Sequence, residues 1–164
     1  SQEICFVKDN DYANYVKRHS NTSIKEGNFV DTKGNVLGRH KGIVNYTIGQ
    51  RKGLGIAFGK PMFVIDINAK NNTVILGDNK DLFQHNLIAK DVNFISIEDI
   101  KEPIRVKAKV RYAAKPADAT VYKVGQDKIK IVFDEAQRAI TKGQSVVMYD
   151  GDKVVGGGII ESSF

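Results

Sequence analysis

From residue 89 to the end of the chain, short stretches with strand-like patterns follow one another with almost no helical periodicity between them. Apolar and polar residues alternate in several of these stretches, as expected when one face of a strand is buried. A sheet of many strands with no covering helices gains by closing on itself, because closure pairs every exposed edge. The sequence therefore predicts a six-stranded antiparallel β-barrel, with strands at 89–95, 104–112, 119–124, 128–133, 145–149 and 153–160.

The first half of the chain predicts a smaller domain of mixed structure. Residues 9–19 carry apolar side chains at helical spacing after a capping Asp or Asn, which predicts a short helix. Turn residues between short apolar runs then predict two hairpins, over 29–37 and 62–76. The predicted fold is mainly β (α+β overall), with a central domain at 1–84 and the barrel domain at 85–164.

Composition narrows the class of protein without deciding its function. Lys and Arg number 25 against 19 Asp and Glu, a net charge of +6 that suits an anionic partner. No stretch approaches the roughly 20 apolar residues needed to span a bilayer, and the first residues do not resemble a signal peptide. One cysteine excludes an internal disulfide and favours a cytoplasmic location. The start, which lacks methionine, suggests a segment of a longer protein.

The second predicted barrel strand carries the densest basic pattern. Because side chains alternate along a strand, its four cations share one face within about 20 Å. A phosphate backbone bound there relieves their mutual repulsion, but acidic neighbours on adjacent strands of a solvated face do so equally well. Both interpretations stay open, as do base stacking and packing for the aromatic residue that follows. The residues concerned are Arg105, Lys107, Lys109, Arg111 and Tyr112.

A glycine-rich loop at 46–56 presents Arg51 and Lys52 side by side. It is not a phosphate-binding P-loop, because Gly53 stands where Ser or Thr is required, and the dinucleotide-binding glycine pattern fails as well. Paired cations on a loop whose glycines allow close approach suit a phosphate ligand. A connection whose charges merely keep it solvated is the alternative, and the residues alone favour it slightly.

Cys5 is the one nucleophile to consider. An unassisted thiol has a pKa near 8.5, so only a minor fraction is thiolate at neutral pH. Ile4 and Phe6 beside it suit a buried, inert cysteine, and the residues alone favour that structural role.

No metal site is predicted. His19, His40 and His85 share no ligand spacing, and the acidic pair at 150–152 fits a tight hairpin turn better than a calcium loop. Three consecutive glycines at 156–158 predict a strand that bends or lets another backbone approach closely.

Several of these stretches occur together in one order, which makes them more informative than any one alone. They are 2–7 (QEICFV), 46–56 (YTIGQRKGLGI), 109–112 (KVRY), 133–140 (FDEAQRAI), 143–152 (GQSVVMYDGD) and 156–158 (GGG). In that order the chain resembles the tRNA-specific 2-thiouridylases (the MnmA family), from just before their second reactive cysteine to the carboxy terminus. The resemblance covers essentially the whole chain.

The resemblance implies a reaction. In this family an amino-terminal domain binds ATP and Mg²⁺ and adenylates the 2-carbonyl oxygen of the wobble uridine in tRNA. The cysteine matching Cys5 takes a sulfane sulfur from a relay protein or cysteine desulfurase and holds it as a persulfide. That persulfide attacks the activated carbon, AMP leaves, and a first cysteine in the amino-terminal domain resolves the enzyme.

The resemblance also implies site residues. Cys5 becomes the expected sulfur carrier, and Arg111, Tyr112 and Gln144 become expected tRNA contacts, with Lys109 and the loop cations Arg51 and Lys52 as secondary candidates. The terminal domain is expected to resemble the second domain of translation elongation factors.

The chain also departs from the family pattern. It has no Ser-Gly-Gly-Val-Asp-Ser type ATP loop and no second cysteine, so it is expected to bind no cofactor and to be inactive alone. Nothing in it resembles a methyl-donor site. The alternative is a non-catalytic tRNA-binding barrel in which Cys5 is structural.

Overall fold

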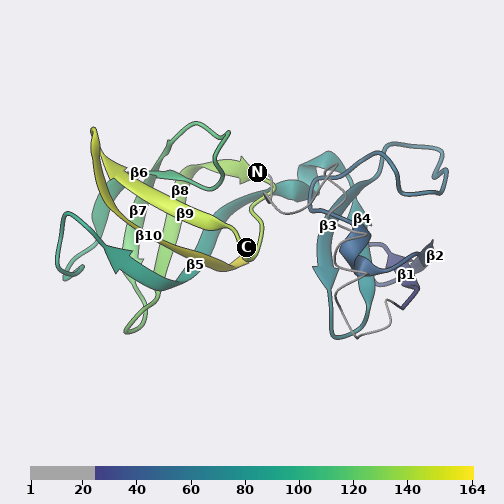
Figure 1. Cartoon of the computed structure of the whole chain (residues 1–164). Coiled ribbons are helices and arrows are strands. Elements are labelled where there is room, and N and C mark those ends of the chain that lie inside the picture. The colour runs from purple at the N-terminus through teal and green to yellow at the C-terminus, as the bar shows by residue number, and fades with distance from the viewer. Residues whose placement is uncertain (1–24) are drawn as a thin grey trace, which may run out of the picture. The chain divides into compact units, whose positions relative to one another are not determined.

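The computed structural model describes residues 25–164, and Figure 1 shows their arrangement. They form two compact units, and the chain passes from one to the other between Leu82 and Phe83. Cys5, His19 and the helix predicted over 9–19 lie outside the described residues. The two units are described separately below.

The first unit is a four-stranded mixed sheet in the order β2-β1-β4-β3. β1 pairs with β4 in parallel, whereas the β1–β2 and β3–β4 pairs are antiparallel hairpins. Both hairpins predicted from turn residues are confirmed. The elements are β1 (Gly27–Val30), β2 (Val36–His40), the 3-10 helix η2 (Ile43–Asn45), β3 (Phe63–Asn68), β4 (Thr73–Gly77) and the 3-10 helix η3 (Asn79–Leu82).

Phe29 lies at the centre of this unit and is fully buried. Three aromatic rings meet it edge-on, those of His40, Tyr46 and Phe58, with centroids 5.6, 5.2 and 6.3 Å away. The buried His40 ring bonds at both nitrogens. Nδ1 accepts the Gly42 N–H at 3.0 Å and Nε2 lies 2.9 Å from the Asn72 carbonyl oxygen. His40 is therefore a satisfied core residue that links the last residue of β2 to the turn just before β4.

The second unit is a closed barrel in the order β10-β5-β8-β7-β6-β9, with every neighbouring pair antiparallel. The predicted six-stranded antiparallel barrel is therefore confirmed. The strands are β5 (Phe83–Phe94), β6 (Ile104–Lys109), β7 (Ala117–Lys123), β8 (Ile129–Arg138), β9 (Ser145–Asp150) and β10 (Lys153–Ser163).

One predicted strand is too long. Residues 104–112 were expected in a single strand, but β6 ends at Lys109. Its pairing with β7 ends at Ala108, and Arg111 instead accepts a turn hydrogen bond of 3.1 Å from the Ala114 N–H. The predicted alternation holds inside β6 and just beyond it, because Val106, Ala108 and Val110 are buried in the barrel core. Arg111 and Tyr112 therefore belong to a loop and not to a strand face.

The three consecutive glycines lie in β10, between β5 and β9. A Cβ on Gly156 would overlap the Asn93 carbonyl oxygen, and one on Gly157 would lie 2.8 Å from the Val146 oxygen. On Gly158 it would meet the Lys90 oxygen at the same 2.8 Å distance. Backbone thus packs against backbone on both sides of β10, which confirms the close approach predicted from the sequence.

Substituting Gly156→Ala should destabilise the barrel by about 2 kcal/mol, since its Cβ meets backbone atoms that cannot rotate away. The urea midpoint of unfolding measures this loss. Gly125→Ala is the matched control, because the nearest atom to its added Cβ is a side-chain carbon of Lys128 at 3.4 Å. Equal midpoints for the two variants would contradict the close-approach account.

Candidate nucleic-acid interface

Strand register places two loops at the same end of the barrel. β6 and β9 pair antiparallel, with Ala108 opposite Met148 and Lys109 opposite Val147. Lys109 is the last residue of β6, and Ser145, two residues before Val147, is the first residue of β9. The loop after β6 (110–116) and the loop before β9 (139–144) therefore leave the barrel side by side.

The first two cations of β6 are neutralised on the barrel surface. Arg105 makes two hydrogen bonds to the Asp134 carboxylate, at 2.8 and 2.6 Å, and a third to the Thr120 hydroxyl at 2.9 Å. These hydrogen bonds lower the pKa of Asp134 and raise that of Arg105. Lys107 pairs with Asp118 at 3.1 Å. For these two residues the structure supports the solvated-face interpretation.

The last two cations differ. Among the described residues, no carboxylate lies within ion-pairing distance of Lys109 or Arg111. The Lys109 ammonium lies 5.3 Å from the centre of the Tyr112 ring. Tyr112 is 78% exposed, so most of its ring is open to solvent. Two unneutralised cations and an exposed ring thus follow one another at the end of β6.

Gln144 lies at the start of β9, with its backbone held in place. Its N–H donates to the Thr141 carbonyl at 3.2 Å, and its carbonyl accepts the Ile160 N–H at 2.8 Å. Its side chain is exposed. Lys109 pairs with Val147, so the loop that carries Arg111 and Tyr112 leaves β6 at the same end of the barrel at which Gln144 enters β9.

Charge is divided between the two ends of the barrel. The two loops beside this surface, 110–116 and 139–144, contain Arg and Lys but no acidic residue. The loops of the opposite end, 95–103, 124–128 and 151–152, contain more acidic than basic residues. We call the first the basic end of the barrel. The charges of the loops therefore favour a polyanion at the basic end over the other end.

Arg51 and Lys52 are exposed in the first unit. Their loop is anchored at its start, where Gly49 donates to the Val64 carbonyl and Gln50 accepts from the Val64 N–H, at 2.8 and 2.9 Å. The Gln50 side-chain amide also donates to the Lys52 carbonyl at 2.9 Å. The loop is therefore fixed against β3 at its base and presents two cations to solvent.

Acidic neighbours on adjacent strands were one of the two interpretations of the basic strand, but the sequence alone did not identify Asp118 and Asp134 as those neighbours. Asp118 lies directly opposite Lys107 in the β6–β7 ladder, so strand pairing was the signal that could have found it. Asp134 lies one strand further away, on β8. Within residues 25–164 no group of three metal-ligating side chains occurs, and no helix is long and apolar enough to cross a bilayer.

Fold and surface together define a mainly β protein with two domains, whose barrel has one basic end. Two family models match the chain: a tRNA methyl transferase PRC-barrel domain at residues 13–78 and an aminomethyltransferase β-barrel domain at 84–160. Together they cover most of the sequence.

Relatives specify the family further. The tRNA-specific 2-thiouridylase MnmA of Clostridioides difficile (strain 630) is 78% identical over 99% of this chain and 45% of the relative. The enzymes of that name from Acetivibrio thermocellus and Clostridium botulinum (strain Okra) are 61% and 58% identical over 98% of this chain. The chain belongs to the tRNA-specific 2-thiouridylase family and spans a little under half the length of these relatives.

Proposed function

We propose that this chain is the sulfur-carrying and tRNA-holding part of a cytoplasmic tRNA-uridine 2-sulfurtransferase. The observation that carries the proposal is the 78% identity, over 99% of the chain, to a relative named as a tRNA-specific 2-thiouridylase. The domain at 1–84 is assigned the sulfur carrier and the barrel at 85–164 the tRNA contacts. The whole enzyme makes 2-thiouridine, and this chain alone is inactive.

Cys5 is the proposed sulfur carrier. Its thiolate takes a sulfane sulfur from a relay protein or cysteine desulfurase, so that an S–S bond forms at Cys5 and the donor leaves as a thiol. The terminal sulfur then bonds to C2 of the wobble uridine as the C2–O bond breaks. A second cysteine, outside this chain, attacks the Cys5 sulfur, which frees the thiocarbonyl and leaves a disulfide for a cellular thiol to reduce.

ATP and Mg²⁺ supply the activation of the uridine oxygen in the whole enzyme. No described residue of this chain is assigned to them. The loop at 46–56 departs from the P-loop pattern, and the described residues contain no cluster suited to a metal ion. Binding of both is therefore proposed to lie in the part of the enzyme that this chain does not include.

The basic end of the barrel is the proposed tRNA contact. Lys109 and Arg111 face phosphates, because no described carboxylate neutralises them. Tyr112 offers a ring on which an unpaired base can stack, and the Gln144 amide both donates and accepts hydrogen bonds. Arg51 and Lys52 form a secondary candidate contact in the other unit.

Replacing Cys5 by Ser in the full-length enzyme should abolish 2-thiouridine formation, because a hydroxyl cannot hold a transferable sulfur. The assay supplies ATP, Mg²⁺, tRNA and a persulfide donor and counts thiolated nucleoside by mass spectrometry. Unaltered tRNA affinity in the variant controls for folding. Normal thiolation by the variant would instead favour the alternative, a tRNA-binding barrel in which Cys5 is structural.

Replacing Arg111 by Ala should weaken tRNA binding by the chain about tenfold and lower the salt slope of log K by about one, as for one lost phosphate contact. Arg105→Ala is the matched control, since it removes the same charge from a residue already neutralised by Asp134. Fluorescence anisotropy over a salt series measures both variants. Equal losses in the two would show that net charge alone attracts the tRNA.

A further inference from the structure

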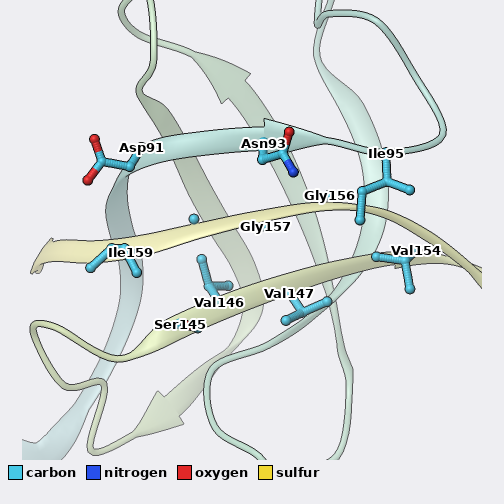
Figure 2. Close-up of a pocket in the computed structure, with 11 residues that line it drawn as sticks. Asp91, Asn93, Ile95, Ser145, Val146, Val147, Val154, Gly156, Gly157 and Ile159 are labelled. Carbon is cyan, nitrogen blue, oxygen red and sulfur yellow. The ribbon is translucent and has the colours of Figure 1, made fainter.

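A trough of about 330 Å³ crosses the outer face of the barrel over β5, β10 and β9. In Figure 2 the middle of the trough follows the glycine segment of β10, with Asp91 and Asn93 on one side and Val147 on the other. The trough exists because Gly156–Gly158 place no side chain between their neighbours. The packing constraint that closes the barrel thus also opens a recess on its surface.

The trough has an apolar lining with a polar edge. Ile95, Val147 and Val154 supply apolar surface on either side of the glycine backbone. Asp91, Asn93 and Ser145 supply a carboxylate, an amide and a hydroxyl. An apolar recess with a few polar groups along its edge is a common setting for a ligand site.

The polar groups of the trough are available to a ligand. None of the three side chains makes a hydrogen bond or ion pair to another described residue. Asp91 also has a φ of 50°, in the left-handed region that non-glycine residues seldom adopt. This conformation breaks the regular alternation of β5, so that Asp91 and Asn93 are exposed although they follow the buried Leu87 and Ala89 at two-residue spacing.

Cations border the trough on its β9 side. β6 is the next strand after β9, and Lys109 lies directly opposite the trough residue Val147. Lys109 therefore lies about two strand spacings, roughly 10 Å, from the glycine segment, and Arg111 follows it in the loop after β6.

We propose that the trough binds one unpaired nucleobase that bears an exocyclic amino group, while Lys109 and Arg111 hold the adjoining phosphates. This inference rests on the proposed tRNA function. The flat base lies on the glycine backbone, Asp91 accepts from its amino group, and the Asn93 amide pairs with a ring nitrogen and a neighbouring donor. Adenine, cytosine and guanine meet this requirement, whereas uracil has no amino group to offer.

Barrel closure favours a base over a peptide as the occupant. An extended peptide usually binds by adding a strand to a free sheet edge. β5, β10 and β9 are each paired on both sides in the barrel, so their backbones offer no such edge at the trough. Stacking of a planar ring on the exposed glycine backbone needs no edge.

Amide NMR of the chain with mononucleotides tests the site directly. AMP and CMP should shift the amide signals of Gly156–Gly158 and Ser145, and UMP and ribose 5-phosphate should shift them much less. Ser145→Trp fills the trough and should remove the response. Equal shifts with ribose 5-phosphate, or a response only to an added peptide, would overturn the proposal.

Asp91→Asn gives a second test, because a purely electrostatic role and a base-binding role of Asp91 predict opposite changes in tRNA affinity. Loss of a negative charge strengthens tRNA binding if Asp91 acts only through its field. Loss of the charged acceptor weakens it, by about fivefold, if Asp91 reads a base. Asparagine tolerates the backbone conformation of Asp91, so folding is not at issue.

Asp127→Asn is the matched control, because it removes the same charge from an exposed residue beside β5 whose carbonyl binds the Val92 N–H. We expect tighter tRNA binding for Asp127→Asn and weaker binding for Asp91→Asn. Tighter binding in both would refute the base site and leave the tRNA function standing. Absence of any salt-dependent tRNA binding by the unaltered chain would instead refute the proposed function itself.

Discussion

The close packing of β10 against β5 and β9 is the constraint on which the rest of the barrel depends. Only glycine allows the approach at positions 156–158, since a Cβ at each would meet backbone atoms of a neighbouring strand. This contact closes the barrel and fixes the register of β9. The β9 register in turn sets the end of β6 beside Gln144 and Ser145. A packing requirement in the core thus determines which surface residues become neighbours.

The surface proposed to hold tRNA differs from the neighbouring barrel surface because its cations lack carboxylate partners, and not because it has more cations. Arg105 and Lys107 have carboxylates within 2.6 and 3.1 Å, and such exposed pairs gain little from a phosphate that must displace a partner. Lys109 and Arg111 have no such partner among the described residues. A phosphate that reaches them displaces only water and counterions, which favours binding.

The architecture could be predicted because its sequence signals are formed by residues close together along the chain. Strand alternation, turn residues and the glycine triplet are local signals, and they gave both hairpins and the six-stranded barrel. The predicted end of this strand was wrong. Arg111 and Tyr112 continue the alternating pattern, but the Arg111 carbonyl accepts a turn hydrogen bond from the Ala114 N–H. Whether the strand continues or the turn forms depends on where β7 begins to pair, and the local sequence pattern does not specify that position.

The candidate site was only partly predictable. Family resemblance pointed to Cys5, Arg111, Tyr112 and Gln144. The residues alone gave no reason to distinguish among the four cations at 105–111. Their difference comes from Asp118 and Asp134, far along the chain and close only after folding. The trough side chains Asp91 and Asn93 were not predicted, because regular alternation would place them on the buried face of Leu87 and Ala89, and the irregular backbone at Asp91 places them outside.

The central claim is that the basic end of the barrel, and not the surface as a whole, meets the tRNA. Hydrogen exchange of backbone amides, compared with and without tRNA, tests it most directly. The account predicts added protection in the loops at 110–116 and 139–144 and none in those at 95–103 and 124–128. Protection at the acidic end, or spread evenly over both ends, would contradict it.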